Sequence, residues 1–330
     1  MDDDAAALEG EGADGGSTAS PGWSRRKILT VSLSGVGAIL AAGVVAVQLV
    51  ERGVLPGKAT LDSLDGACSV KTPAVRFAPL GPMISGQFFS SARGREVGYT
   101  IAWPPGFAPG DALPLVVMLH GDGGTHETAI KAMSPAQLLA ITDPQDSTRL
   151  NTKVPMALVT VDGGNGYWHP HPDDDPMAMV VSELIPLCQE KGLGGNEHGI
   201  ALMGISMGGY GAIALAEHHP KLARAVAAIS PAIWTEYSEA QSVNADAYTN
   251  ANEFAAYNAV THAGALEGLP VFVTSGVDDP FHPGVVAFAK VAPSATTVVF
   301  PNGCHTDPFF VASEPEALFF LSSHLSDVRP

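Results

Sequence analysis

The sequence predicts a three-layer α/β fold with a mostly parallel central sheet and an antiparallel hairpin at its N-terminal edge. Short runs of apolar and β-branched residues alternate with longer stretches of helical periodicity. Most of these runs are apolar at every position, as expected of parallel strands covered by helices on both faces. Hydrophobic residues make up 46% of the 330 residues and charged residues 15%, which excludes a mostly disordered chain.

The elements follow in order along residues 71–330, which we expect to form one domain. An antiparallel hairpin opens the domain, because a short polar turn joins the first two strand-like runs. Strands are predicted at Ile84–Ser90, Val97–Trp103, Pro114–His120, Pro155–Asp162, Gly199–Gly204, Ala225–Ser230, Pro270–Ser275 and Thr296–Phe300. Helices are predicted at Thr125–Leu139, Met177–Lys191, Met207–His218, Pro283–Val291 and Pro315–Leu325.

Residues 231–269 interrupt this alternation and are long for a connection. They are either a cap over a site or a surface excursion that packs its own aromatic residues.

The first seventy residues have a different character. Residues 1–27 form an acidic tail, expected to be disordered, that ends in the twin-arginine motif Arg25-Arg26-Lys27. Residues 28–50 are uncharged and long enough to cross a bilayer, and residues 51–70 are a linker. The pattern predicts export by the twin-arginine machinery, either with signal cleavage or with residues 28–50 kept as a membrane anchor. Residues 51–330 would then be extracellular or in the cell envelope.

The net charge restricts the classes of binding partner, and the cysteines bear on the cellular compartment. A formal net charge of −17 argues against nucleic-acid partners, which need a basic surface. Cys188 lies in an apolar helical pattern and reads as a buried small hydrophobe. Cys68 and Cys304 are candidates for a disulfide if the domain is exported, although their spacing does not decide it.

The central motif is Gly204-Ile205-Ser206-Met207-Gly208, a G-x-S-x-G sequence between a predicted strand and a small-residue helix start. That setting is typical of a nucleophile elbow, in which a sharp turn projects the serine side chain. A serine needs a base held by an acid, and in this class both follow the serine along the chain. His305 and Asp279 follow the last two strands; Asp278 is the alternative acid. The candidate oxyanion donors are the backbone N–H groups of Met207 and of Asp122. Asp122 lies in the glycine-rich loop that follows the predicted Pro114–His120 strand.

A loop after the Pro155–Asp162 strand carries further candidates. Tyr167 and Trp168 are expected either to wall a substrate pocket or to anchor the loop by packing. His169, His171, Asp173, Asp174 and Asp175 resemble a metal cluster, but their prolines and irregular spacing favour a solvated acidic loop, and no metal is expected.

From about Pro104 to Phe310 the chain resembles actinobacterial α/β-hydrolases of the esterase D and mycolyltransferase group. The segments that carry the resemblance are Leu119–Gly123, Val161–Asn165, Tyr167–Pro170, Gly204–Ala212, Gly276–Pro280 and Gly303–His305. The resemblance implies an α/β-hydrolase fold and a Ser206, Asp279, His305 triad that acts on acyl esters without a cofactor.

Three functions remain open. The first is an exported serine carboxylesterase for small-molecule or lipid esters. The second is an acyltransferase, similar to mycolyltransferases, that moves the acyl group to a cell-envelope sugar or lipid. The third is a non-catalytic envelope-binding protein on a hydrolase fold, although this chain keeps a candidate for each triad position.

Overall fold

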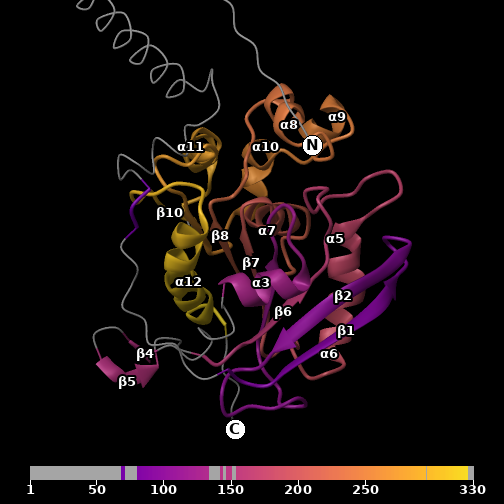
Figure 1. Ribbon diagram of the computed structural model, residues 1–330, viewed down its shortest axis with the longest axis vertical. Helices are drawn as coiled ribbons and strands as arrows, with labels where there is room; N and C mark the ends of the chain where they lie inside the picture. Colours follow the sequence, from indigo (N-terminus) through magenta and orange to yellow (C-terminus); the bar gives the residue numbers. More distant parts are fainter. Residues whose placement is uncertain are drawn as a thin grey trace, which may run out of the picture. The chain divides into compact units, whose positions relative to one another are not determined.

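An eight-stranded mixed sheet forms the centre of the computed structural model, which describes residues 68–70, 80–133, 142–143, 146–150, 154–294 and 296–325. These residues belong to one unit, Asp62–Pro330. The strand order is β1-β2-β6-β3-β7-β8-β9-β10, and the β1–β2 hairpin at one edge can be followed in Figure 1. The strands are β1 (Met83–Ser90), β2 (Arg95–Ala102), β3 (Leu115–Leu119), β6 (Ala157–Val161), β7 (Ile200–Ile205), β8 (Ala225–Ile229), β9 (Val271–Thr274) and β10 (Thr296–Val299).

The pairing confirms the predicted fold class. Within this eight-stranded sheet, β1 and β2 are antiparallel, β2 is antiparallel to β6, and the other pairs are parallel. Leu119 lies opposite Gly204, and Ile229 lies opposite both Ile205 and Thr274. The carboxyl ends of the parallel strands are therefore aligned, which brings the loops that follow them to one edge of the sheet.

Helices cover both faces of the sheet, and alternate residues of each central strand point to different cores. In β3, Val117 packs into the core shared with α7 (Met207–His218) and α11 (His282–Val291), whereas Val116 packs into the core shared with α12 (Asp307–Ser322). The helix α3 (His126–Met133) lies next to α12 on the latter face (Figure 1). Strands apolar at every position are the consequence of this two-sided cover.

One predicted helix begins in the wrong place. The last helix was expected to start at Pro315, but α12 begins at Asp307 and Pro315 lies inside it. Proline lacks the N–H that would bond four residues back, which makes it look like a helix start. Here Pro308 occupies the first turn instead, and burial of Phe309, Phe310 and Leu318 offsets the missing hydrogen bond.

The predicted Met177–Lys191 helix contains an irregularity that also comes from a proline. It runs as α5 (Pro176–Met179), the π-helical segment η1 (Val180–Leu184) and α6 (Ile185–Gln189). Pro186, in the first turn of α6, has no N–H for an ordinary helical bond, consistent with the local widening. Cys188 is buried in this helix as a free thiol, as expected, and burial raises its pKa to about 12.

The 231–269 segment folds into four short helices: α8 (Tyr237–Val243), α9 (Ala251–Ala256), α10 (Ala259–His262) and the 3₁₀ turn η2 (Ala263–Leu266). Tyr248 and Phe254 are buried and pack edge to face, with ring centroids 5.1 Å apart. The segment thus packs its own aromatic residues. It also contributes two residues, Val243 and Asn244, to the cavity described below.

Other expectations fall outside the described residues. These are the acidic tail, the twin-arginine motif, the apolar segment 28–50, most of the 51–70 linker and the end of the Thr125–Leu139 helix beyond residue 133. Among the described helices, none is both long and apolar enough to span a membrane. A small antiparallel pair, β4 (Thr142–Asp143) and β5 (Asp146–Leu150), was not predicted.

Candidate active site

Ser206 occupies a sharp turn between β7 and α7. Its backbone has φ 55° and ψ −121°, a strained conformation for a residue other than glycine. The flanking glycines are required by close approach: a Cβ atom at Gly204 would lie 2.0 Å from the Gly208 carbonyl oxygen, and one at Gly208 would lie 2.0 Å from the Leu119 oxygen. The turn is held by a hydrogen bond from the Ser206 N–H to the Ile229 carbonyl, 2.9 Å long. This is the geometry of a nucleophile elbow.

His305 and Asp279 continue a hydrogen-bond chain from this serine. His305 Nε2 lies 2.8 Å from Ser206 Oγ, and His305 Nδ1 lies 2.9 Å from Asp279 Oδ2. A carboxylate only accepts, so Nδ1 carries the proton and Nε2 is free to accept the serine proton. The Asp279 side chain is buried, and its other oxygen accepts a 2.8 Å hydrogen bond from the Phe281 N–H. Of the two adjacent candidates, Asp279 is therefore the acid that faces His305.

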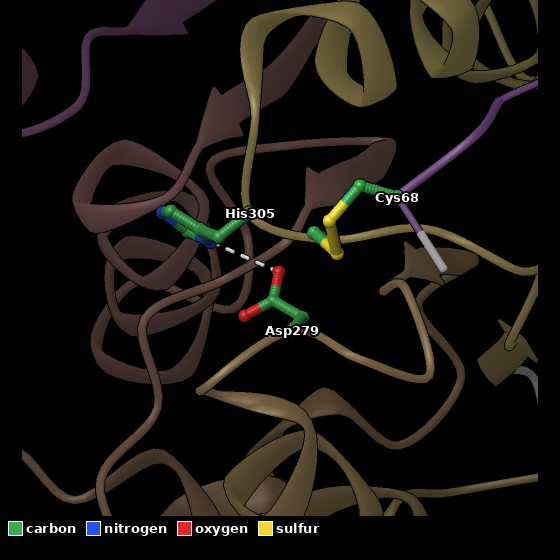
Figure 2. Close-up of a disulfide and its surroundings, with 4 residues drawn as sticks. Cys68, Asp279 and His305 are labelled. Carbon is green, nitrogen blue, oxygen red and sulfur yellow. Dashed lines mark hydrogen bonds and ion pairs between the residues drawn. A yellow bond between two sulfur atoms is a disulfide. The ribbon is translucent and has the colours of Figure 1, made fainter. Parts of the chain in front are cut away.

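A disulfide fixes the residue next to this histidine. Cys304 is bonded to Cys68, far away in the sequence, and both lie beside the His305–Asp279 pair (Figure 2). The imidazole is also enclosed by aromatic rings, with the centroid of Phe281 5.0 Å away and that of Phe310 4.9 Å away. The loop that presents His305 is thus held covalently on one side and by packing on the other.

A cavity of about 490 Å³ opens onto Ser206 and His305. Asp122, Met207 and Tyr167, all predicted site residues, are in its wall. The other apolar lining residues are Met118, Ala129, Ile205, Phe281, Phe310 and Val243, and the polar or glycine lining residues are His120, Gly121, Gly124, Thr128, Asn244 and Asp307. Such a half-apolar cavity beside a nucleophile suits the uncharged chain of an ester.

The glycine-rich loop runs directly against the serine, since a Cβ atom at Gly121 would lie 3.4 Å from Ser206 Cβ. His120 fixes this loop, although no pattern in the sequence singled it out as a site residue. Its Nε2 accepts a 2.9 Å hydrogen bond from the Gly163 N–H, so its Nδ1 donates to the Gly121 carbonyl at 2.7 Å. Burial lowers the pKa of His120, which keeps the ring neutral. Asn165 adds a further hydrogen bond, from the Gly123 N–H to its side-chain oxygen, at 2.9 Å.

Tyr167 and Trp168 have different roles despite being neighbours. Tyr167 lines the cavity, and its hydroxyl accepts a 2.8 Å hydrogen bond from Trp234 Nε1. Trp168 does not line it, which corrects the substrate-wall interpretation. Its side chain is fully buried, and its indole N–H donates to the His120 carbonyl at 3.1 Å. Trp168 is a packing anchor beneath the glycine-rich loop.

The predicted acidic loop is only partly solvated. Asp173 is exposed, but Asp174 forms ion pairs with Arg93 at 2.6 Å and Arg95 at 2.7 Å, and Asp175 caps the start of α5. His169 and His171 turn away from these carboxylates and pack against the 231–269 segment.

Comparisons with known proteins bear on this geometry. Residues 90–305, more than half of the chain, match the model of a family described as "Putative esterase". No curated protein sequence matches the chain.

Several solved structures share its fold. A ferulic acid esterase has 18% identity and a TM-score of 0.62 over 76% of this chain and 100% of its own. An S-formylglutathione hydrolase from Agrobacterium tumefaciens has 16% identity and a TM-score of 0.60, covering 78% of this chain and 100% of its own. MPT51 of Mycobacterium tuberculosis has 16% identity and a TM-score of 0.60, covering 74% and 100%. At these identities the likeness concerns the fold.

Proposed function

Because the chain belongs to the "Putative esterase" family, we propose that it is a serine carboxylesterase that hydrolyses acyl esters through an acyl-enzyme on Ser206. The observation that carries the proposal is the unbroken hydrogen-bond chain from Ser206 through His305 to Asp279 at the wall of a cavity. The same observation argues against a non-catalytic binding protein, which has no need of this alignment.

The proposed reaction follows from the geometry. Ser206 Oγ attacks the ester carbonyl while His305 Nε2 takes its proton, and Asp279 stabilises the imidazolium that forms. The Asp122 and Met207 amides would donate to the oxyanion, since both residues lie in the cavity wall beside Ser206. His305 returns the proton to the leaving alcohol. Water then attacks the acyl-enzyme with His305 as the base, releasing the acid and freeing Ser206. No cofactor enters any step.

The direct test uses the purified full chain with p-nitrophenyl esters from acetate to palmitate. Asp279→Asn should lower kcat by roughly 10³-fold to 10⁴-fold because the histidine loses its orienting carboxylate. Asp278→Asn is the matched control, since the neighbouring carboxylate does not face His305, and should retain near-full activity. Ser206→Ala should abolish both hydrolysis and labelling by a serine-directed phosphonate. Wild-type protein that is not labelled would refute the proposal.

Transfer to an alcohol uses the same acyl-enzyme and differs only in the second nucleophile. Adding a sugar acceptor to the ester assay separates the two reactions. Free acid as the main product supports the esterase; an acyl sugar formed at the expense of free acid would instead establish the acyltransferase similar to mycolyltransferases.

We also propose that the chain is exported. The Cys68–Cys304 disulfide supports this, because disulfides persist in oxidising compartments, and so does the Arg25-Arg26 motif ahead of the apolar segment. Replacing both arginines of the motif by lysine should retain the chain in the cytoplasm, whereas Arg52→Lys, outside the motif, should not. Unchanged fractionation of the double variant would contradict twin-arginine export.

A further inference from the structure

Away from the catalytic cavity, two histidines and a glutamate from distant parts of the chain meet in the interior. His169 and His171 follow Trp168, and Glu253 lies in α9. One ligand atom from each lies within 4.8 Å of those from the other two. His171 Nδ1 is 2.8 Å and His169 Nδ1 is 3.5 Å from Glu253 Oε1. The side chain of His169 is fully buried, and those of His171 and Glu253 are 15% and 12% exposed.

The other nitrogen of each histidine ring, Nε2, already faces a backbone carbonyl oxygen. His169 Nε2 lies 2.7 Å from the Ala247 carbonyl oxygen, and His171 Nε2 lies 2.6 Å from the Gly166 carbonyl oxygen. Since a carbonyl oxygen only accepts, both Nε2 atoms carry the proton, and in a neutral ring Nδ1 then holds a lone pair. This pattern, one ring nitrogen donating to a backbone carbonyl and the other free, is typical of metal-binding histidines.

The cluster also holds the rings rigidly. His169 is stacked between Tyr248 and Tyr257, with both ring centroids 4.8 Å from its own. Because its Nε2 faces the Ala247 carbonyl oxygen, its Nδ1 is the ring nitrogen that can bind a cation.

Acceptors therefore converge at one point, and among the described residues only a protonated His171 could supply a hydrogen donor to them. The His169 Nδ1 lone pair faces Glu253 Oε1 and the Pro170 carbonyl oxygen, the latter 3.2 Å away. Glu253 Oε1 is buried and receives no hydrogen bond within the described residues, although His171 Nδ1 is close to it. A proton on His171 Nδ1 would donate to Glu253 Oε1. His169 Nδ1 would still face two acceptor oxygens, Glu253 Oε1 and the Pro170 carbonyl oxygen. A cation between the three side chains would satisfy all of them.

We propose that His169, His171 and Glu253 bind one divalent transition-metal cation, with zinc as the best match. Two imidazoles and a carboxylate are zinc ligands, and bond lengths of about 2.0–2.2 Å place tetrahedral ligand atoms roughly 3.3 Å apart. The 3.5 Å pair already fits, and the 2.8 Å pair has to open by about 0.5 Å. The Pro170 carbonyl oxygen or a water completes the coordination.

This site would link two walls of the catalytic cavity. His169 and His171 lie two and four residues after Tyr167, and Glu253 comes from the segment that supplies Val243 and Asn244. Because the cluster lies outside the Ser206–His305–Asp279 chain, we assign the ion a structural role and no step in catalysis. The inference does not depend on the chain being an esterase.

The site had little signal in the sequence. The nearby Asp173, Asp174 and Asp175 suggested the wrong partners, and Glu253 is remote along the chain. Only folding of the 231–269 segment against the loop brings the third ligand into place.

The test measures zinc binding by the full chain after removal of metal with a chelator. Isothermal titration should show one zinc per chain, with a rise in Tm on binding. His171→Gln and Glu253→Gln should each weaken binding by more than about 100-fold, beyond the loss typical of outer-shell changes. His324→Gln, on an exposed histidine, and Asp173→Asn, on the exposed acid of the same loop, are the matched controls and should bind as wild type.

Cobalt(II) provides a readout that requires no variant. Wild-type chain loaded with cobalt should show the intense visible bands of tetrahedral coordination, which zinc should displace. Absence of stoichiometric zinc binding and of these bands would overturn the proposal and leave a proton-mediated His171–Glu253 ion pair. Binding that survives in both ligand variants, or is lost in Asp173→Asn, would equally overturn this ligand set.

Discussion

The contribution of the Cys68–Cys304 disulfide to the free energy of unfolding can be predicted from the length of the loop that it closes. The two cysteines are 236 residues apart, so the bond closes most of the domain into one loop. In the chain-entropy treatment, a loop of this length removes unfolded-state entropy worth about 5.5 kcal/mol at 25 °C. Measured losses on removing native disulfides are about 2–5 kcal/mol, because strain and residual structure reduce the ideal value. We therefore expect Cys68→Ser to lower the free energy of unfolding by about 3–5 kcal/mol.

Loss of the disulfide should have only a small effect on the folded site. The stabilisation acts mainly on the unfolded chain, and Asp279 still holds His305 when the disulfide is absent. At 25 °C, phosphonate labelling of Ser206 in Cys68→Ser should thus slow by less than about tenfold. A large loss of stability with a small loss of reactivity distinguishes loop closure from direct support of the histidine.

The assay is urea unfolding of the full chain followed by intrinsic fluorescence, with and without reductant. Cys68→Ser, Cys304→Ser and the double variant should have the same stability and lose their response to reductant. Cys188→Ala, which removes the free thiol, should keep that response. A double variant as stable as wild type, or a wild-type unfolding midpoint that reduction leaves unchanged, would contradict stabilisation by loop closure.

Three further predictions concern single side chains. Gly208→Ala should prevent folding or cost several kcal/mol because its Cβ meets a backbone carbonyl at 2.0 Å, whereas Gly195→Ala, with nothing within 4 Å, should be neutral in urea unfolding. Glu217 is buried without a hydrogen-bond partner in the described structure, and burial raises its pKa to about 9, from 4.5. Above pH 4.5 the unfolded state loses this proton while the folded state keeps it, so stability falls as pH rises towards 9, by at most about 1.4 kcal/mol per pH unit. Glu217→Gln should flatten that slope in unfolding curves collected between pH 5 and pH 8; an unchanged slope would show that Glu217 is not its source. Tyr167→Phe leaves the Trp234 N–H without its acceptor and should cost about 1 kcal/mol by thermal unfolding, a result that an unaltered Tm would contradict.

Strand positions were largely predictable because burial on both faces leaves an uninterrupted apolar run in the sequence. Val116 and Val117 face different cores, yet each must be apolar. Helix boundaries at Pro315 and Pro186 were less predictable, because a proline can begin a helix or be tolerated inside one when tertiary packing offsets the lost bond.

The candidate site also has a part that the sequence predicts and a part that depends on tertiary packing. Ser206, Asp279 and His305 each follow a strand, and parallel strands end at one edge, so their proximity follows from order along the chain. The direction in which the Trp168 side chain points does not follow from the order of residues along the chain. Tyr167 and Trp168 both have positive φ, at 56° and 61°, which nothing in their residue types indicates. Contacts with Glu253 were equally hidden, since they depend on how the 231–269 segment folds.

The cavity wall contributed by Val243 and Asn244 has a consequence for how this protein can change over time. Ser206, His305 and Asp279 follow strand ends. Val243 and Asn244 belong instead to the segment between β8 and β9, which a separate stretch of the gene encodes. Insertions, deletions or exchanges around α8 can therefore alter which molecules enter while the hydrogen bonds of Ser206, His305 and Asp279 stay intact. Selectivity and reactivity are separately mutable, and recombination within this stretch is a direct route to variants with new preferences.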